Sequence, residues 1–546
     1  MYPYKRTSLN WAFFGLLAFP ALTSAEGAVP DTPSSRADNH PARVAAQVDR
    51  QLTEEALQGK QLVAPVDDAA YLRRVSLDII GEPPSPAEIT AFVLDPASDK
   101  RARVVSRLLA NPLYGQNWAR YWRDVILARR SNERALGLAG NSVVVYLTEQ
   151  FNQGRGWDAI TRSFITATGK VRSTGSTALS IAHEGKPEET AAETARIFLG
   201  IQLQCAQCHD HPYDSWKRVQ FHQLAAYFPR VVVRPLRAEV LPDFEITSIE
   251  KVRGGGRNKA LPEHYMSDLN DPKAKGTLTQ PLFFLGEEKE EAGMTDRERR
   301  ATLAARITAR DNPWFAKALV NRVWAELLGR GFYEPIDDLG VDRKCVAPKT
   351  IDYLSRQFVD SGYDLRWLIR TITATTAYQR QGRARADSDQ APFSAVAIQP
   401  LRADVLYSAL SASLEAYDLD RVKPNRRGRP DSPRLQFDQA FGFDPSQPRD
   451  EVTASIAQAL LMMNSPQLAR AMRADTQQSS LGRLAAAVKD NDQALEELYL
   501  RTLSRLPSDA ELAAARAHIH ETGNRGTALE DILWALINSA EFRERR

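Results

Sequence analysis

The chain has 546 residues, of which 43% are hydrophobic and 25% charged, ordinary proportions for a globular protein of several domains. Its net charge of +3 is too small to indicate a nucleic-acid-binding protein. The three cysteines are too few for a disulfide framework, so we expect hydrophobic cores to stabilise the fold.

Residues 1–25 have the pattern of a secretory signal peptide. Lys5 and Arg6 precede an apolar stretch over 11–22, and small residues over 23–25 suit a cleavage site. The apolar stretch is short for a membrane span of ~20 residues, although an uncleaved membrane anchor is the alternative. No later segment is long and apolar enough to cross a bilayer. We therefore expect a periplasmic or otherwise exported protein, with no transmembrane segment after cleavage.

The rest of the chain predicts a mainly α, multi-helical protein of two domains. Pro, Ser and Asp dominate residues 26–42, which indicates a disordered lead-in. Helical periodicity covers most of the chain after residue 42, but short β-branched and aromatic runs between turn residues indicate a small β insert near 231–286. We predict a helical domain over 43–230, the β insert and linker over 231–294, and a second helical domain over 295–546.

A similar helical unit occurs near both ends of the chain. Residues 71–88 and 498–511 each contain a helical stretch, a Pro-containing stop and a Ser-x-x-Glu sequence that begins a second helix. The Ser-x-x-Glu sequences lie at 85–88 and 508–511. Two explanations of this similarity are about equally good: an internal duplication of a small helical unit, or chance, because capping boxes are common.

The most informative stretch of the sequence is Cys-Ala-Gln-Cys-His at residues 205–209. This C-x-x-C-H spacing is the attachment pattern of c-type haem. Two thiols three positions apart can add to the two vinyl groups of one haem, and the adjacent imidazole then ligates the iron. Cys205 and Cys208 are two of only three cysteines, so a chance occurrence is improbable. Covalent haem attachment takes place outside the cytoplasm, in agreement with the predicted export.

The sequence around the motif predicts where it lies. Helical periodicity over 190–203 leads into the cysteines, and residues 214–215 suit the N-cap of a second helix over 216–228. The motif is therefore expected at a helix end and in the turn after it. His209 would be the proximal haem ligand, and Asp210 is a candidate partner for its other ring nitrogen.

The distal side of such a haem has several candidates. His222 lies on the following predicted helix and is the nearest histidine that is not too close to the motif. Met462 and Met463 are alternatives if the second half folds back, although both also suit a buried apolar helix face. With no protein ligand, the iron would be open to a small molecule, and catalysis would become a further option.

The same stretch also suits a metal ion without haem. The thiols of Cys205 and Cys208, the imidazoles of His209 and His211, and the Asp214 carboxylate form a dense group of donors. Zinc takes two thiolates and one or two imidazoles in a tetrahedral site, and copper is the second option. A disulfide or purely structural role competes for the same two sulfurs.

The strings CAQCHDHPYDSW and NRVWAELLGRGFYEPIDD carry a resemblance to an exported, planctomycete-type family. In this family a cytochrome-like domain of unknown function 1549 precedes a domain of unknown function 1553. Two departures are clear, because Cys345 stands where relatives more often have a polar or small residue, and 441–451 lacks the cysteine of many relatives. The matching stretches are 72–88, 111–124, 198–228, 312–339, 361–380, 400–410, 457–466 and 498–542.

The resemblance implies an exported protein but no settled activity. Its cytochrome-like name agrees with one covalent haem c used in electron transfer or a haem-dependent redox step within a periplasmic complex. Relatives are often encoded beside a sulfatase-like protein, which together with a periplasmic redox protein is a candidate partner. The alternatives are a zinc-, copper- or iron-dependent enzyme and a haem-free scaffold, so enzymatic activity stays open.

Overall fold

The computed structural model describes most of the chain beyond the predicted signal peptide. The predicted signal peptide, and residues 26–38 of the predicted lead-in, lie outside the described residues. The described residues are 39–237, 242–250, 261–271, 273–285, 293–340, 342–384, 391–416, 423–424, 430–431, 433–448, 452 and 455–546.

The described chain is mainly α-helical, which confirms the predicted fold class. The helical elements before residue 230 are α2 (Pro41–Leu52), η1 (Thr53–Leu57), α3 (Asp68–Ile80), α4 (Pro86–Leu94), α5 (Lys100–Ala110), α6 (Leu113–Leu127), α7 (Ala135–Asn152), α8 (Trp157–Ile165), η2 (Gly175–Thr177), α9 (Ala178–Ala182), α10 (Pro187–Thr194), η3 (Ala195–Leu199), η4 (Gln204–Gln207) and α11 (Arg218–Ala225).

The C-terminal half adds a second series of helices. They are α12 (Asp296–Ile307), α13 (Phe315–Leu328), α14 (Pro348–Asp360), α15 (Leu365–Ala374), α16 (Ala403–Ser413), α17 (Pro433–Phe441), α18 (Ile456–Asn464), α19 (Pro466–Ala471), α20 (Ser480–Ala487), α21 (Asn491–Leu503), α22 (Asp509–Thr522), α23 (Arg525–Asn538) and α24 (Ala540–Arg543).

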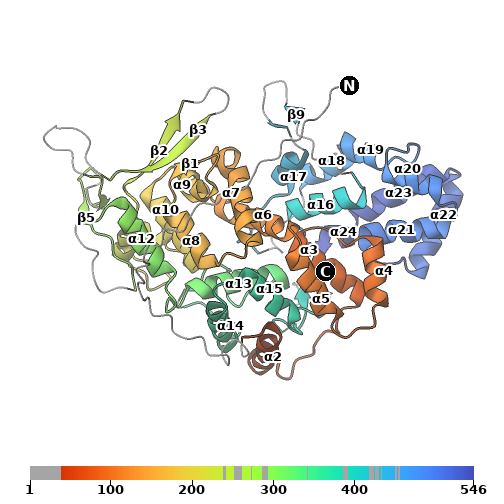
Figure 1. The fold of residues 1–546 in the computed structure, drawn as a ribbon, viewed down its shortest axis with the longest axis horizontal. Coiled ribbons are helices and arrows are strands. Elements are labelled where there is room, and N and C mark those ends of the chain that lie inside the picture. Colours follow the sequence, from red (N-terminus) through yellow and green to blue (C-terminus); the bar gives the residue numbers. More distant parts are fainter. Residues whose placement is uncertain are drawn as a thin grey trace, which may run out of the picture. The chain divides into compact units, whose positions relative to one another are not determined.

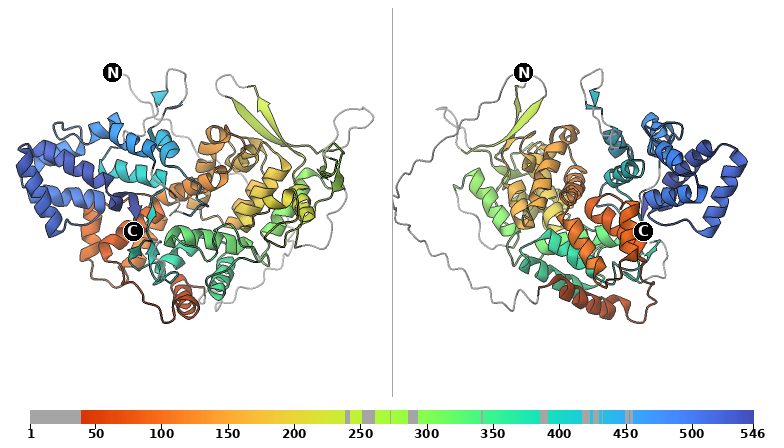
Figure 2. Two further views of the ribbon diagram at one scale, coloured as in Figure 1. Left: turned by 180° about the vertical axis from the view of Figure 1, so that it is seen from behind. Right: turned by 45° about the vertical axis from the view of Figure 1, so that its right-hand side comes forward.

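The strands form small sheets, and four of them make up the predicted β insert. Strand β3 pairs antiparallel with both β1 and β2, and β4 pairs antiparallel with β5. The β2–β3 ribbon extends beyond the neighbouring helices (Figures 1 and 2). The strands are β1 (Gly169–Lys170), β2 (Val231–Leu236), β3 (Asp243–Ser248), β4 (His264–Met266), β5 (Thr277–Thr279), β6 (Gly382–Arg383), β7 (Val396–Ala397), β8 (Gln399–Pro400), β9 (Lys423–Pro424), β10 (Pro430–Asp431) and β11 (Glu544–Arg545).

The first hydrophobic core contains buried residues between Val44 and Phe393. Within it, α6 buries Trp118 and Trp122, which are four positions apart and therefore share one helix face. Helices α13 and α15 of the C-terminal half pack on η3 and α2 of the N-terminal half. The β insert therefore does not separate two hydrophobic cores, because helices on both sides of it contribute to the same one.

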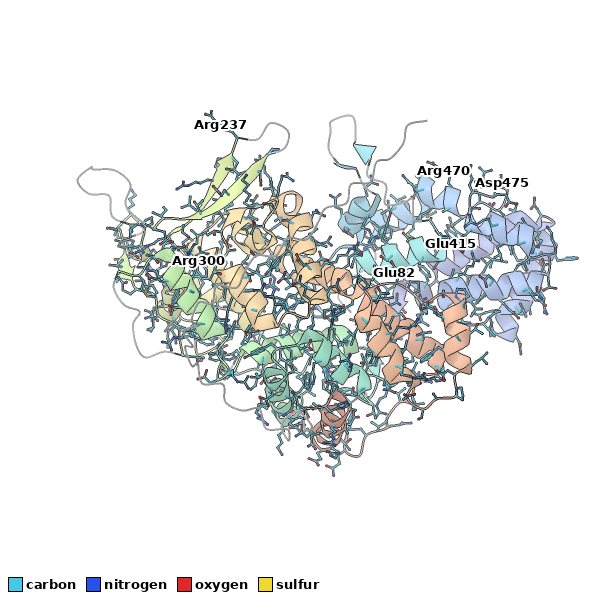
Figure 3. The ribbon with its side chains drawn as sticks, in the orientation of Figure 1. Glu82, Arg237, Arg300, Glu415, Arg470 and Asp475 are labelled. Atoms are coloured by element: carbon cyan, nitrogen blue, oxygen red, sulfur yellow. The ribbon has the colours of Figure 1, made fainter. Side chains whose placement is uncertain are left out.

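The second hydrophobic core contains Leu77 and buried residues between Leu401 and Phe542. Helices α16 and α20–α23 contribute most of it, and Figure 1 shows them on the side away from the β2–β3 ribbon. Glu415, just after α16, pairs with Arg501 on α21 at 2.9 Å and with Arg483 on α20 at 2.5 Å (Figure 3). The first core ends at Phe393 and the second, apart from Leu77, begins at Leu401, so the boundary between the cores lies near residue 400.

The buried Arg300 links the β insert to the helices through hydrogen bonds. Arg300 on α12 contacts Asp296 at 2.8 Å and donates to the hydroxyl of Ser248 at the end of β3 at 2.9 Å (Figure 3). It also donates to the backbone carbonyls of Ile165 and Ala167. A buried guanidinium with several fixed acceptors orients the elements that supply them.

Among the described helices, none combines the length and hydropathy needed to cross a bilayer.

Candidate functional site

The two motif thiols lie on the surface, on one side of a 3₁₀ turn. Cys205 is inside η4 and Cys208 directly follows it, and both thiols are free and exposed. In a 3₁₀ helix, side chains three positions apart eclipse each other. The turn therefore presents both sulfurs in one direction, as two-point attachment to a single planar group requires.

His209 follows the turn with one ring nitrogen already bound. Its Nδ1 lies 2.7 Å from the backbone carbonyl of Asp210, and its side chain is exposed. A carbonyl only accepts, so Nδ1 carries the hydrogen and Nε2 keeps its lone pair. A metal-binding histidine commonly has this arrangement, with one nitrogen donating to a carbonyl and the other free to ligate. The partner is the backbone carbonyl of Asp210. The sequence suggested the Asp210 side chain, with a backbone carbonyl as the equally common alternative.

The other predicted donors are not gathered around the thiols. His211 Nδ1 accepts the backbone N–H of Tyr213 at 3.2 Å, and the Asp214 carboxylate accepts that of Ser215 at 2.7 Å. Within the described ranges, no three His, Cys, Asp or Glu side chains are close enough together to hold a metal ion. Cys205, Cys208 and His209 are thus close in sequence but do not form such a group in the described chain.

His222 is buried and hydrogen-bonds to the backbone of the motif. Its Nε2 donates to the backbone carbonyl of Gln207 at 3.0 Å, and its Nδ1 lies 2.8 Å from Nε2 of His264. These two bonds occupy both ring nitrogens of His222. In this arrangement His222 holds the carbonyl of Gln207, which lies between the two cysteines in sequence. Its partner His264 on β4 is a residue that the sequence analysis did not identify.

Burial makes the two stacked histidines poor bases. Desolvation lowers the pKa of His222 to about 4, and it also lowers the pKa of His264. Glu188 on α10 lies 3.7 Å from Nδ1 of His264 and partly offsets this effect. Both imidazoles are therefore neutral near pH 7. His222 then has one N–H, which it donates to the Gln207 carbonyl, and its other nitrogen accepts the N–H of His264.

The helix after the motif begins later than predicted. The structure places α11 at Arg218–Ala225, not at residue 216, and Asp214 does not cap it. The Asp210 carboxylate accepts the backbone N–H of Arg218 at 2.9 Å instead, and Lys217 donates to it at 3.1 Å. The backbone bond and then Lys217 lower the pKa of Asp210, so a carboxylate inside the motif loop stabilises the positive end of α11.

Trp216 anchors the end of the motif loop. Its ring is buried against Phe284 of the β insert at 4.9 Å and Trp314 of the C-terminal half at 5.7 Å, measured between ring centroids. The Trp216 carbonyl also accepts the backbone N–H of His211 at 2.8 Å. The tryptophan in HDHPYDSW therefore has a packing role. Local sequence did not indicate this role, because the ring partners Phe284 and Trp314 are far away along the chain.

The methionines that were distal candidates lie on α18 in the second-core region. Met462 is buried in the second core, whereas Met463 is 64% exposed. Met462 therefore has the apolar environment that its sequence pattern also suited. The residues of the motif are not part of this second core.

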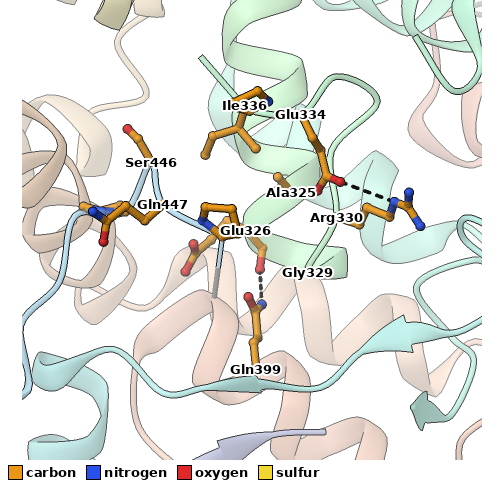
Figure 4. A pocket seen from close by; sticks show the side chains of 12 residues that line it. Ala325, Glu326, Gly329, Arg330, Glu334, Ile336, Gln399, Ser446 and Gln447 are labelled. Carbon is orange, nitrogen blue, oxygen red and sulfur yellow. Dashed lines mark hydrogen bonds and ion pairs between the residues drawn. The ribbon is translucent and has the colours of Figure 1, made fainter. Parts of the chain in front are cut away.

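A cavity beside α13 is lined by part of the second specific string. Its volume is about 30 Å³, enough for ordered water but not for a macrocycle. In Figure 4, Arg330 pairs with Glu334 at 3.5 Å, and Gln399 donates to the Glu326 carbonyl at 2.9 Å. The loop residue Ser446 forms another part of its wall.

Comparison with known families places both halves of the chain. Residues 43–232 match the model PSCyt2, a protein of unknown function (DUF1549). Residues 299–424 and 422–519 match the model PSD1, a protein of unknown function (DUF1553). Searches of curated proteins and of solved structures each found no match. The two family matches occur in the order that the sequence resemblance predicted.

Proposed function

Because the chain belongs to the family in which a PSCyt2 (DUF1549) region precedes a PSD1 (DUF1553) region, we propose that it is an exported protein carrying one covalent c-type haem. The observation that carries the proposal is the geometry of residues 205–209. Two exposed thiols lie on one side of a 3₁₀ turn, next to an imidazole whose Nε2 is free.

The residues of the motif fit the attachment chemistry. Cys205 and Cys208 would hold a haem through two thioether bonds, each thiol adding across one vinyl double bond while its hydrogen passes to the other vinyl carbon. This addition needs no external oxidant, but it does need reduced thiols at Cys205 and Cys208. His209 holds its Nδ1 hydrogen on the Asp210 carbonyl and offers Nε2 as the iron ligand. When bound, the haem would supply one-electron transfer.

The surroundings of the motif favour electron transfer as its use. The attachment residues are exposed, so a partner protein can approach them closely. His222 already has both nitrogens bonded, so its use as a sixth ligand would require the His222–His264 pair to separate. We propose that the protein is exported and that its partner is a periplasmic redox protein. A sulfatase-like protein is the second candidate partner.

A mass measurement tests the haem proposal. The protein is exported from a host with cytochrome c maturation and examined by intact mass and visible absorption. We expect the mass of one haem and a Soret band, both lost in Cys205→Ser/Cys208→Ser. Cys345→Ser is the matched control, because this half-buried cysteine lies outside the motif and should leave both signals unchanged.

Other outcomes identify the alternatives. A colourless protein with stoichiometric zinc or copper that depends on the same cysteines would overturn the haem proposal in favour of a metal site. A colourless, metal-free protein would leave the disulfide or scaffold function, and its mass would show whether the two thiols are oxidised.

A further inference from the structure

Both flanks of the motif contact one short segment of the C-terminal half. Before the motif, the backbone carbonyl of Gly200 accepts the N–H of Leu339 at 2.7 Å. After the motif, Asp214 lies so close to Gly340 that a Cβ at residue 340 would overlap its Oδ2. Residues 337–340 are therefore in contact with both ends of the loop that carries the cysteines.

Asp337 is the centre of this contact. It is fully buried, and its carboxylate accepts from Gln202 at 3.1 Å and from Arg196 at 3.0 Å. Arg322 and Arg129 lie 3.6 and 3.7 Å away. Burial alone would raise the pKa of Asp337, but the surrounding guanidinium groups lower it below its usual range. The carboxylate therefore stays charged and binds Gln202, three residues before the first cysteine.

Arg196 is itself held rigidly. It forms ion pairs with Glu193 at 2.6 Å, donates to the Val125 carbonyl at 2.9 Å, and donates to the Ser446 hydroxyl at 2.9 Å. Ser446 belongs to the cavity wall in Figure 4. A buried guanidinium with all these acceptors has little freedom, so it fixes the position of Asp337 relative to α10 and η3.

Gly200 allows the close approach to Leu339. Its φ of +64° lies in the left-handed region, and it ends the π-helical turn η3. A Cβ at this position would also lie 2.7 Å from Leu339 Cδ1. Both conformation and space therefore require glycine at the point where the chain leaves η3 and enters the motif loop.

We propose that the C-terminal half positions the haem-binding loop, with Asp337 and Gly340 as the positioning residues. The reason for positioning the loop rests on the proposed function, because a rigid loop would hold both thiols and His209 in the geometry of haem attachment before haem binds. The positioning itself concerns only residues of this chain. It assigns the PSD1 region a role in the site of the PSCyt2 region.

Amide hydrogen exchange on the full-length, haem-free chain tests the positioning. In Asp337→Asn we expect amide exchange over residues 200–216 to become about tenfold faster. A change of this size is typical when one hydrogen bond to a charged group is lost. Asp404→Asn is the matched control, because Asp404 is also buried and its carboxylate pairs with a buried arginine, Arg402, at 3.1 Å. This control should leave exchange over 200–216 unchanged.

A second pair of variants covers the case in which Asp337→Asn does not fold. Gly340→Ala introduces a methyl group against Asp214, whereas Gly137→Ala on α7 has open space around the added carbon. We expect faster exchange over 200–216 in the first variant only. Unchanged exchange in folded Gly340→Ala and folded Asp337→Asn would overturn the positioning role.

The haem-loaded protein separates this inference from the proposed function. If the wild-type chain carries haem, Asp337→Asn should shift its midpoint potential and reduce the loaded fraction, and Asp404→Asn should do neither. If the wild-type chain carries no haem while exchange still responds to Asp337→Asn, the proposed function fails and the positioning stands. If haem is bound but exchange and potential are both unchanged, the positioning fails and the proposed function stands.

Discussion

The exposed His209 of the motif and the buried His222 show how burial determines the role of a histidine. His209 and His222 are thirteen positions apart in sequence, yet one is exposed with a free nitrogen and the other is buried with none. The C-x-x-C-H pattern identified His209 because its neighbours in sequence define its chemistry. The pattern gave no information on His222, because its partner His264 comes from a strand of the β insert.

The buried histidine pair predicts a pH dependence of stability. The pKa of His222 is about 4 in the folded chain and near 6.5 when unfolded, so the unfolded chain binds more protons between these values. The free energy of unfolding should therefore fall as pH drops from about 6.5 to about 4, with no further contribution from this group above pH 7. Each such group contributes at most about 1.4 kcal/mol per pH unit.

Denaturant unfolding of the haem-free chain at several pH values measures this slope. His222→Gln keeps an N–H donor in reach of the Gln207 carbonyl and removes the titrating ring. We expect a shallower fall in stability between pH 6.5 and 4 for this variant. His520→Gln on α22 is the control, since this exposed histidine should leave the slope unchanged. An identical slope in His222→Gln would contradict the prediction.

At the scale of elements, the two similar helical units share the same local features. Helices α3 and α21 end in a left-handed residue, Gly81 and Ser504 respectively. Helices α4 and α22 then begin with complete capping boxes. In both, the glutamate of the box also pairs with an arginine at 2.8 Å. The capping boxes were predictable because every bond of a capping box lies within four residues, whereas the pair between Glu88 and Arg107 joins residues 19 positions apart.

Removing either cap should destabilise the chain by about the same amount. In Ser508→Ala and in Ser85→Ala, the backbone N–H of the third helical residue loses its acceptor, which typically costs about 1 kcal/mol. Denaturant titration followed by far-UV circular dichroism measures the loss. Ser173→Ala, an exposed serine that caps no helix, should change stability by much less. A neutral effect in both cap variants would contradict the capping role.

The start of α11 was not predictable in the same way. Asp214 and Ser215 have the sequence pattern of an N-cap, but Asp210 makes the bond to Arg218 across eight positions. The intervening loop returns on itself because the His211 N–H binds the Trp216 carbonyl. A cap supplied through a loop depends on tertiary packing, here on Trp216, and local sequence patterns do not record it.

At the scale of the whole described chain, the division into hydrophobic cores differs from the division into sequence families. The family matches change between residues 232 and 299, but the cores divide near residue 400. Helices α12–α15 therefore belong to the PSD1 match and to the first core at once. This placement brings residues 337–340 and Trp314 to the motif loop.

Arg73 on α3 connects the second core to the first. It is buried and donates to the carbonyls of Thr502 and Phe542 at 2.8 and 3.3 Å and to the Ser504 hydroxyl at 3.2 Å. Arg73→Met keeps the length of the side chain but leaves these acceptors without their donor. We expect a loss of about 3 kcal/mol, from unsatisfied buried groups.

Scanning calorimetry checks the Arg73 prediction. The second core should unfold at a lower temperature than in the wild-type chain, either as a separate transition or as a lower single one. Arg103→Met removes an exposed arginine of α5 and should change the transition little, because exposed ion pairs contribute little. Equal transitions in the two variants would show that Arg73 does not couple the cores.

The sequence by itself determined the features that depend on near neighbours. These are the mainly α class, the β insert, the capping boxes and the spacing of the two thiols and His209, because each requires residues within one turn or one strand. The family order was also readable from the sequence, because the matching strings are spread along it. Only the tertiary structure decided the His222–His264 pair, the Trp216 anchor, the core boundary and the Asp337 contact. Each of these joins segments far apart in sequence, and burial of apolar and charged groups selects their partners.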